Sequence, residues 1–310
     1  MAKLEEYKDG HYLWNYVPSM VGAVIFIILF FAATVFHVWR MFKTRTWFCI
    51  PFALGCLSEA IGYCARAASV NDTGTLGPYL VQSIFILIPP ALFAASIYMT
   101  LGRIMRYVKG EHHSVIRINW LTKIFVLGDW LSFMVQGNAA GLLFKTSTMR
   151  IGQGIILAGL FIQIISFGCF FIVAVIFQLR MRKNPTRESY NVEASWERYL
   201  YMLYAVSVLI LIRSIFRVVE YIQGQTGYSM KNEWTLYAFD SIPMVVVTVV
   251  FFIWYPSRIR IPPGGHVEDD SDGIQMRLDS ESGERRRPKS TLFTFGIFGL
   301  LGAISRRWGR

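Results

Sequence analysis

Seven mostly apolar stretches of about 20 residues recur along the chain and limit its fold more than any other feature. A helix of that length spans the roughly 30 Å hydrocarbon core of a bilayer. Hydrophobic residues make up 54% of the 310 residues, which also favours a membrane protein. We therefore predict an all-α membrane protein whose seven transmembrane helices lie near residues 17–38, 47–68, 79–101, 121–144, 151–179, 199–222 and 235–255.

The segments outside this helix bundle differ from it in composition. Residues 1–16 are acidic where a cleaved signal peptide would be basic, so the first apolar stretch is predicted to remain as an anchor. Residues 257–310 alternate acidic and basic blocks, which is typical of a disordered tail. This tail ends in a short hydrophobic segment, Leu292–Ile304, which is too short to span comfortably. The predicted domains are thus an N-terminal segment (1–16), a transmembrane domain (17–256) and a tail (257–310).

The distribution of Lys and Arg among the connections predicts the orientation in the membrane. The segments after the first, third and fifth spans contain twelve of these residues, and those after the second, fourth and sixth contain three. Because cytoplasmic connections are enriched in Lys and Arg, we predict an extracellular N-terminus and a cytoplasmic tail. The net charge of +11 then reflects topology, and a nucleic-acid partner is not expected.

A possible glycosylation site agrees with this orientation. Asn71 begins the acceptor sequence Asn71-Asp72-Thr73 in the connection after the second span. That connection is extracellular by the charge rule. We therefore predict a glycoprotein modified at Asn71.

The cysteines and histidines give no sign of a metal site or cofactor. All four cysteines fall in predicted spans, where we expect small buried hydrophobic side chains. The histidines are scattered, and no nucleophile and base have the spacing of an active site. We therefore predict a protein without metal or cofactor that is not an enzyme.

Ionisable residues inside the predicted spans are the strongest functional signal. Each charge near the centre of a bilayer costs roughly 2.5–3.5 kcal/mol, so partners or water must compensate it. From their depth, we predict that these residues face one another around a polar space in the outer half of the bundle. Near mid-membrane lie Glu59, Asp129 and Arg213, and further out lie Arg66, Arg217, Glu220 and Asp240, together with the uncharged polar residues Gln82 and Gln136.

Counting these groups leaves four acids against three arginines, which indicates room for a cation. Another interpretation stays open for the outer residues. Arg66 could extend to the headgroups, and Arg217 with Glu220 could form an ordinary pair along one helix.

Prolines interrupt two spans, and Pro89, Pro90 and Pro243 are predicted either to permit hinging or to serve static packing.

Five segments on different spans carry a pattern shared with one family of membrane proteins. They are "EAIGYCAR" (Glu59 to Arg66), "PPALFAASIY" (Pro89 to Tyr98), "GDWLSFMVQGNAAG" (Gly128 to Gly141), "GLFIQ" (Gly159 to Gln163) and "IRSIFRVVEYIQG" (Ile212 to Gly224). With them, the chain resembles the fungal lipid-translocating exporter family over roughly Tyr12 to Pro256. The order of the segments on seven helices makes the resemblance specific.

The resemblance implies a function as well as a fold. It adds Tyr63 and Gln163 to the expected substrate pathway, and it implies a plasma-membrane protein that exports amphipathic lipids such as sphingoid long-chain bases. The partners would be the bilayer and the lipid, and the outcome would be resistance to toxic lipids. A seven-helix receptor or lipid-stress sensor that acts through its cytoplasmic tail is the alternative, since its topology would be the same.

Overall fold

The computed structural model describes residues 14, 16, 18–70, 73–140, 148–186, 196–224 and 227–257. Within these ranges seven helices are long and apolar enough to cross a membrane, and there is no strand. This confirms the predicted all-α, seven-helix integral membrane protein. The predictions for Asn71 and for the tail with its segment Leu292–Ile304 lie outside the described residues.

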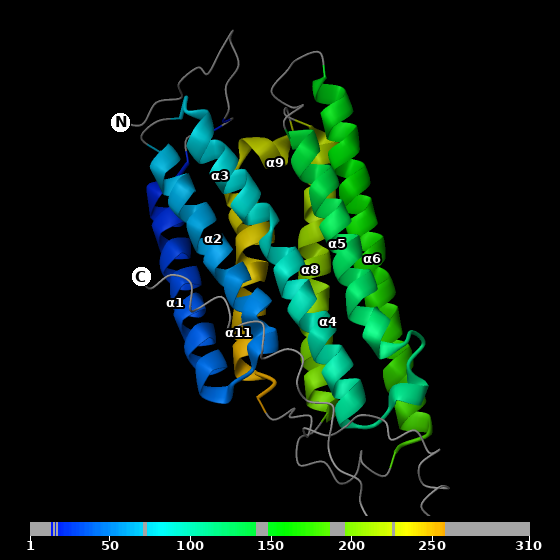
Figure 1. Cartoon of the computed structure of the whole chain (residues 1–310). Coiled ribbons are helices and arrows are strands. Elements are labelled where there is room, and N and C mark those ends of the chain that lie inside the picture. Colours follow the sequence, from blue (N-terminus) through cyan, green and yellow to red (C-terminus); the bar gives the residue numbers. More distant parts are fainter. Residues whose placement is uncertain are drawn as a thin grey trace, which may run out of the picture. The chain divides into compact units, whose positions relative to one another are not determined.

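Most of the described chain is helical, and Figure 1 shows the helices as one bundle. Short helical segments connect or extend the longer ones. In chain order the elements are α1 (Met20–Thr44), η1 (Trp47–Cys49), α2 (Ile50–Ser69), α3 (Leu76–Leu87), α4 (Pro89–Tyr107), η2 (Glu111–His113), α5 (Ile118–Ala140), α6 (Met149–Lys183), α8 (Trp196–Gln223), α9 (Tyr228–Lys231), α10 (Glu233–Leu236), the π-helical η4 (Tyr237–Ser241) and α11 (Ile242–Ile253).

Neighbouring helices in the sequence are mostly neighbours in space. Helix α1 packs on α2 and α11, α2 on α3 and α4, α4 on α5 and α8, and α6 on α5 and α8. Aromatic side chains fill the space between α2, α4 and α11, where the Phe52 ring lies 4.6 Å from Phe93 and 4.0 Å from Phe251. The outer faces keep large apolar side chains exposed, as a lipid solvent requires.

Two prolines divide the third span into two helices. Helix α3 ends at Leu87, and Pro89 and Pro90 form the first turn of α4, which continues end to end from α3 (Figure 1). Proline has no backbone N–H, so Pro90 cannot donate to the carbonyl of Ile86 four residues earlier. Pro89 likewise cannot donate to the carbonyl of Phe85, so the two prolines leave two carbonyls in the middle of the span without their helical donors.

A π turn precedes the proline of the seventh span. The N–H of Ile242 donates to the carbonyl of Tyr237, five residues back, and Pro243 follows directly. The wider turn buries two successive side chains, Asp240 and Ser241, on the inner side of the bundle. Hinging at Pro89, Pro90 and Pro243 stays a prediction.

The cysteine expectation was wrong for two of the four residues. Cys49 and Cys56 are buried, whereas Cys64 and Cys169 lie on the outer surface of the bundle. The physical reason is that the outer face of a membrane helix is itself in an apolar solvent, where a thiol is as acceptable as in a core.

Candidate functional site

Three residues of α8 form an ion-pair cluster with η4. Arg213, Arg217 and Glu220 recur at spacings of four and three residues, so they share one face of α8. Arg217 binds Asp240 of η4 at 2.7 Å (Nη2 to Oδ2) and Glu220 at 3.1 Å (Nη1 to Oε2). Arg213 pairs through Nε with the other oxygen of Asp240. One carboxylate that is 1% exposed thus holds two arginines.

The break at the prolines provides Arg213 with a second partner. Its Nη2 donates to the carbonyl of Ile86 at 2.6 Å. This is the carbonyl that Pro90 leaves without a helical donor. A buried cation on α8 and an unsatisfied carbonyl on α3 therefore satisfy each other. Leaving either group without a partner in the bundle interior would be costly.

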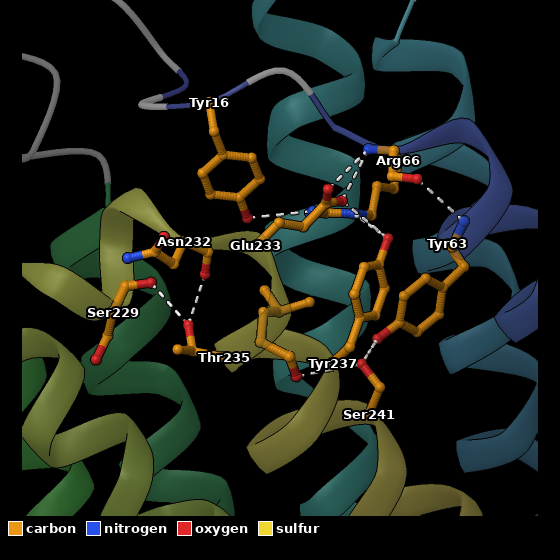
Figure 2. Close-up of polar contacts among 12 residues, drawn as sticks. Tyr16, Tyr63, Arg66, Ser229, Asn232, Glu233, Thr235, Tyr237 and Ser241 are labelled. Atoms are coloured by element: carbon orange, nitrogen blue, oxygen red, sulfur yellow. Dashed lines mark hydrogen bonds and ion pairs between the residues drawn. The ribbon is translucent and has the colours of Figure 1, made fainter.

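A second network surrounds Arg66 near the start of α1 (Figure 2). Arg66 is fully buried, and its Nη2 lies 2.6 Å from Glu233 Oε1 and 3.1 Å from the Tyr16 hydroxyl. Glu233 also accepts from the Tyr237 hydroxyl at 2.9 Å and from the N–H of Ser19 at 2.8 and 3.0 Å. The alternative in which Arg66 extends to the headgroups is therefore wrong, because a carboxylate and aromatic rings enclose it.

The aromatic residues around Arg66 come from two parts of the chain, from residues that precede α1 and from η4. Its guanidinium lies 5.4 Å from the rings of Trp14 and Tyr237 and 5.6 Å from that of Tyr16, within the range of cation–π attraction. Burial raises the pKa of the Tyr16 hydroxyl above its usual value, and Arg66 opposes this effect. Tyr16 therefore stays a neutral phenol. Tyr16 and Ser19 thus connect the chain before α1 to Arg66 of α2 and Glu233 of α10.

Tyr63 connects this network to η4. Its hydroxyl hydrogen-bonds to the hydroxyl of Ser241, next to Asp240 (Figure 2). Its ring stacks on Phe26 and Phe30 of α1, with centroids 5.3 and 5.7 Å away. Tyr63 therefore joins α1, α2 and η4.

The two acids predicted near mid-membrane make no ion pair with the arginines among the described residues. Glu59 is 1% exposed, its Oε1 has no hydrogen-bond partner, and it makes no ion pair with any described residue. Asp129 is 3% exposed and accepts a hydrogen bond from the Tyr98 hydroxyl at 2.7 Å. The phenol of Tyr98 itself packs against Phe125 and Phe170. The structure therefore separates the predicted group into several smaller ones.

The amide residues of α5 and α6 form another small group. Gln136 donates through Nε2 to Ser132 Oγ at 2.7 Å and to Gln163 Oε1 at 3.4 Å. The Ser132 hydroxyl donates to the carbonyl of Gly159 at 2.5 Å. These bonds hold α5 close to α6 beside the pocket described next.

A pocket of about 580 Å³ lies among α3, α5, α6 and α8. Among the predicted site residues, Gln82, Gln136, Arg217 and Glu220 line it, and the other polar site residues do not. Aliphatic and aromatic side chains form most of the remaining wall. They include Trp14, Tyr16, Tyr79, Leu80, Ile86, Leu87, Phe133, Ile156, Leu160, Tyr221 and Leu236.

The rim of the pocket lies at the surface of the bundle. Ser83 and Ile84 of α3 and Gly137 and Asn138 of α5 line the pocket and are exposed. A β-carbon added at Gly137 would meet nothing within 4 Å, so the space beside this residue is open. The pocket therefore opens between α3 and α5, on a side of the bundle where a membrane would present lipid.

Sequence reasoning missed part of this site. Glu233 and Tyr237 hold Arg66, and Trp14, Tyr16 and Tyr79 line the pocket, yet none was predicted as a site residue. The available signal was the group of aromatic residues just before the first span. In the described residues no group of three His, Cys, Asp or Glu side chains could hold a metal ion.

Comparison with known proteins gives relatives over most of the chain. The family model described as "RTA1 like protein" matches residues 52–261. Protein RTA1 of Saccharomyces cerevisiae is 36% identical over 80% of this chain and 86% of the relative. Protoporphyrin uptake protein 1 of the same species is 34% identical over 79% of this chain and 92% of the relative.

A more distant relative carries the name of a lipid transporter. The sphingoid long-chain base transporter RSB1 of S. cerevisiae is 23% identical over 92% of this chain and 87% of the relative. No solved structure matches the chain. These matches confirm the resemblance drawn from the five sequence segments. The chain belongs to the RTA1-like protein family.

Proposed function

We propose that this protein moves amphipathic lipids across the membrane and thereby protects the cell from toxic lipids, acting as a transporter and not as an enzyme. The observation that carries the proposal is the pocket that opens between α3 and α5. It combines a polar side, formed by Gln82, Gln136, Arg217 and Glu220, with a wall of aliphatic and aromatic side chains. An amphipathic molecule needs both surfaces.

The position of the opening fits a substrate that arrives from the lipid phase. A lipid could place its head group beside Arg217 and Glu220 while its tail stays among apolar side chains near Ile84 and Leu87. The ion pairs in this region would spare the head group part of the cost of crossing a dry bilayer. In this proposal the inner polar groups, including Glu59, Asp129 and the Arg213–Asp240 pair, continue the pathway.

The names of two relatives support an amphipathic substrate in general terms. One is named as a transporter of sphingoid long-chain bases and the other as a protoporphyrin uptake protein. Both molecules join an extended apolar body to charged or polar groups. A plasma-membrane location, with the N-terminus outside, is part of the proposal.

The test is lipid crossing in vesicles that contain the purified full-length protein. A labelled sphingoid base, the same base acylated on its nitrogen and a labelled phospholipid are followed separately, and vesicles without protein set the background. We expect at least one of the three to cross at least tenfold faster with protein. If none crosses faster than in empty vesicles, the transporter proposal is wrong and a receptor or lipid-stress sensor replaces it.

A pair of glycine variants ties transport to the pocket. Gly137→Phe would place a large ring in the open space at the rim, and we expect at least a fivefold loss of rate. Gly154→Phe on α6 is the matched control, because a β-carbon there also meets nothing within 4 Å and the residue does not line the pocket. Equal rates for the two variants would place the pathway elsewhere.

A further inference from the structure

We propose that the pocket selects amphipathic molecules whose head group is uncharged and carries hydroxyl or amide groups, in preference to free amines, carboxylates or phosphates. This inference rests on the proposed function and deepens it, since it names the class of molecule that the pocket accepts. It is carried by the charge balance of the lining, by its unsatisfied hydrogen-bonding atoms and by its apolar wall.

The charges at the pocket already neutralise one another. Arg217 and Glu220 line the pocket and pair at 3.1 Å, and the cluster is completed by Arg213 and Asp240. Two arginines therefore face two acids. Arg66, whose aromatic neighbours Trp14 and Tyr16 line the pocket, is balanced by Glu233 at 2.6 Å. The excess of acid predicted from the sequence does not extend to this lining.

A charged head group would unbalance this neutral lining. An ammonium group could share Glu220 with Arg217, as two arginines share Asp240, but it would add a positive charge that no acid of the cluster balances. A carboxylate or phosphate beside Arg217 would add negative charge in the same way. An unbalanced buried charge is strongly unfavourable in a bundle interior, and an uncharged head group adds none.

Hydrogen-bonding capacity remains unused in the same lining. Buried atoms without a partner among the described residues are the carbonyl oxygens of Gln82 and Gln136 and the N–H groups of Trp14 (Nε1) and Arg217 (Nε). All four residues line the pocket. Two of the atoms accept hydrogen bonds and two donate them, so a matching group must do both. Hydroxyl and amide groups do so without adding charge.

The rest of the lining defines the other end of the ligand. Leu80, Leu87, Ile156 and Leu160 provide an aliphatic wall, and Phe133 and Tyr221 add flat surfaces. A volume of about 580 Å³ lies within the range of ordinary small-molecule sites. The pocket therefore suits a hydroxylated or amide-bearing head group with part of its hydrocarbon body, while the remaining tail can leave through the opening between α3 and α5.

The experiment compares three ligands that share one hydrocarbon tail. They are a long-chain amino diol with its nitrogen acylated by a short chain, the free long-chain base, and the phosphorylated base. Equilibrium binding is measured to the full-length protein in lipid nanodiscs at pH 7. We expect the uncharged acylated compound to bind at least tenfold more tightly than either charged one. Equal or tighter binding of a charged compound would overturn the inference.

A single substitution separates this role from a structural one. Gln82→Leu removes a buried oxygen that has no partner among the described residues, so the melting temperature should stay the same or rise. The same change should weaken binding of the uncharged compound at least fivefold. Gln178→Leu is the matched control, since Gln178 is buried on α6 outside the pocket and should leave binding unchanged. Unchanged binding in Gln82→Leu would count against the inference.

The two proposals fail in different ways. Selective binding of the uncharged compound without lipid crossing in vesicles would contradict transport and leave this inference standing. Rapid crossing of the free base, together with tighter binding of that base than of its acylated form, would support transport and overturn this inference.

Discussion

At the scale of single residues, the cluster depends on one carboxylate that serves two cations. Asp240 binds Arg213 through one oxygen and Arg217 through the other, and Arg213 also satisfies the carbonyl of Ile86. Removing one partner of a buried pair usually costs about 3–5 kcal/mol, much of it from the group left unpaired. The Arg213–Asp240 pair should therefore behave as a unit.

A double-mutant cycle tests this coupling. We expect Arg213→Met and Asp240→Asn to destabilise the protein by about 3 kcal/mol each, and the double variant to cost clearly less than their sum. Thermal unfolding in detergent measures all three. The matched control is the exposed pair Arg182 and Glu197 at 3.1 Å, where Arg182→Met and Glu197→Gln should show no measurable coupling. Additive effects at Arg213 and Asp240 would contradict the geometry.

At the scale of elements, the two proline breaks determine which polar groups meet. Pro90 frees the Ile86 carbonyl for Arg213, and the π turn before Pro243 places both Asp240 and Ser241 inside the bundle. Both breaks therefore contribute directly to the polar groups at the centre of the proposed pathway.

Restoring the helix at Pro90 should disturb function more than stability. Pro90→Ala returns an N–H that competes with Arg213 for the Ile86 carbonyl, so Arg213 keeps Asp240 but its second contact weakens, while the helix gains a hydrogen bond. We expect a melting temperature within a few degrees of wild type and at least a threefold slower lipid crossing. Pro51→Ala is the control, because Pro51 lies in the first turn of α2, where a helix needs no donor. Normal crossing by Pro90→Ala would contradict a role of the Arg213–Ile86 contact in transport.

At the scale of the whole molecule, the sequence predicted the seven spans because apolar length is a strong signal in a bilayer. It also indicated that the charges would need compensation. It could not identify which charged residues pair with one another. The π turn changes the direction in which the Asp240 side chain points, and the sequence indicated Glu233 only as a residue at the outer edge. Trp14 and Tyr16 were assigned to an extracellular segment, and only tertiary packing shows that they line the pocket.

The orientation of the whole bundle in the membrane stays a prediction, and labelling in intact fungal cells tests it. The starts of α1 and α3 share one end of the bundle with α9 (Figure 1), and the charge rule places this end outside. Gly77, in the first turn of α3, is exposed with nothing within 4 Å of an added β-carbon. Glu111 lies in η2, in the connection at the opposite end of the third span, and is also exposed.

Cysteines at these two positions should react on opposite sides of the membrane. In a background with Cys64→Ala and Cys169→Ala, a membrane-impermeant maleimide should label Gly77→Cys in intact cells. It should label Glu111→Cys only after the membrane is permeabilised. The physical basis is the excess of Lys and Arg on the η2 side, which the negative potential of the inner leaflet stabilises. Labelling of Glu111→Cys in intact cells, with Gly77→Cys protected, would reverse the predicted orientation.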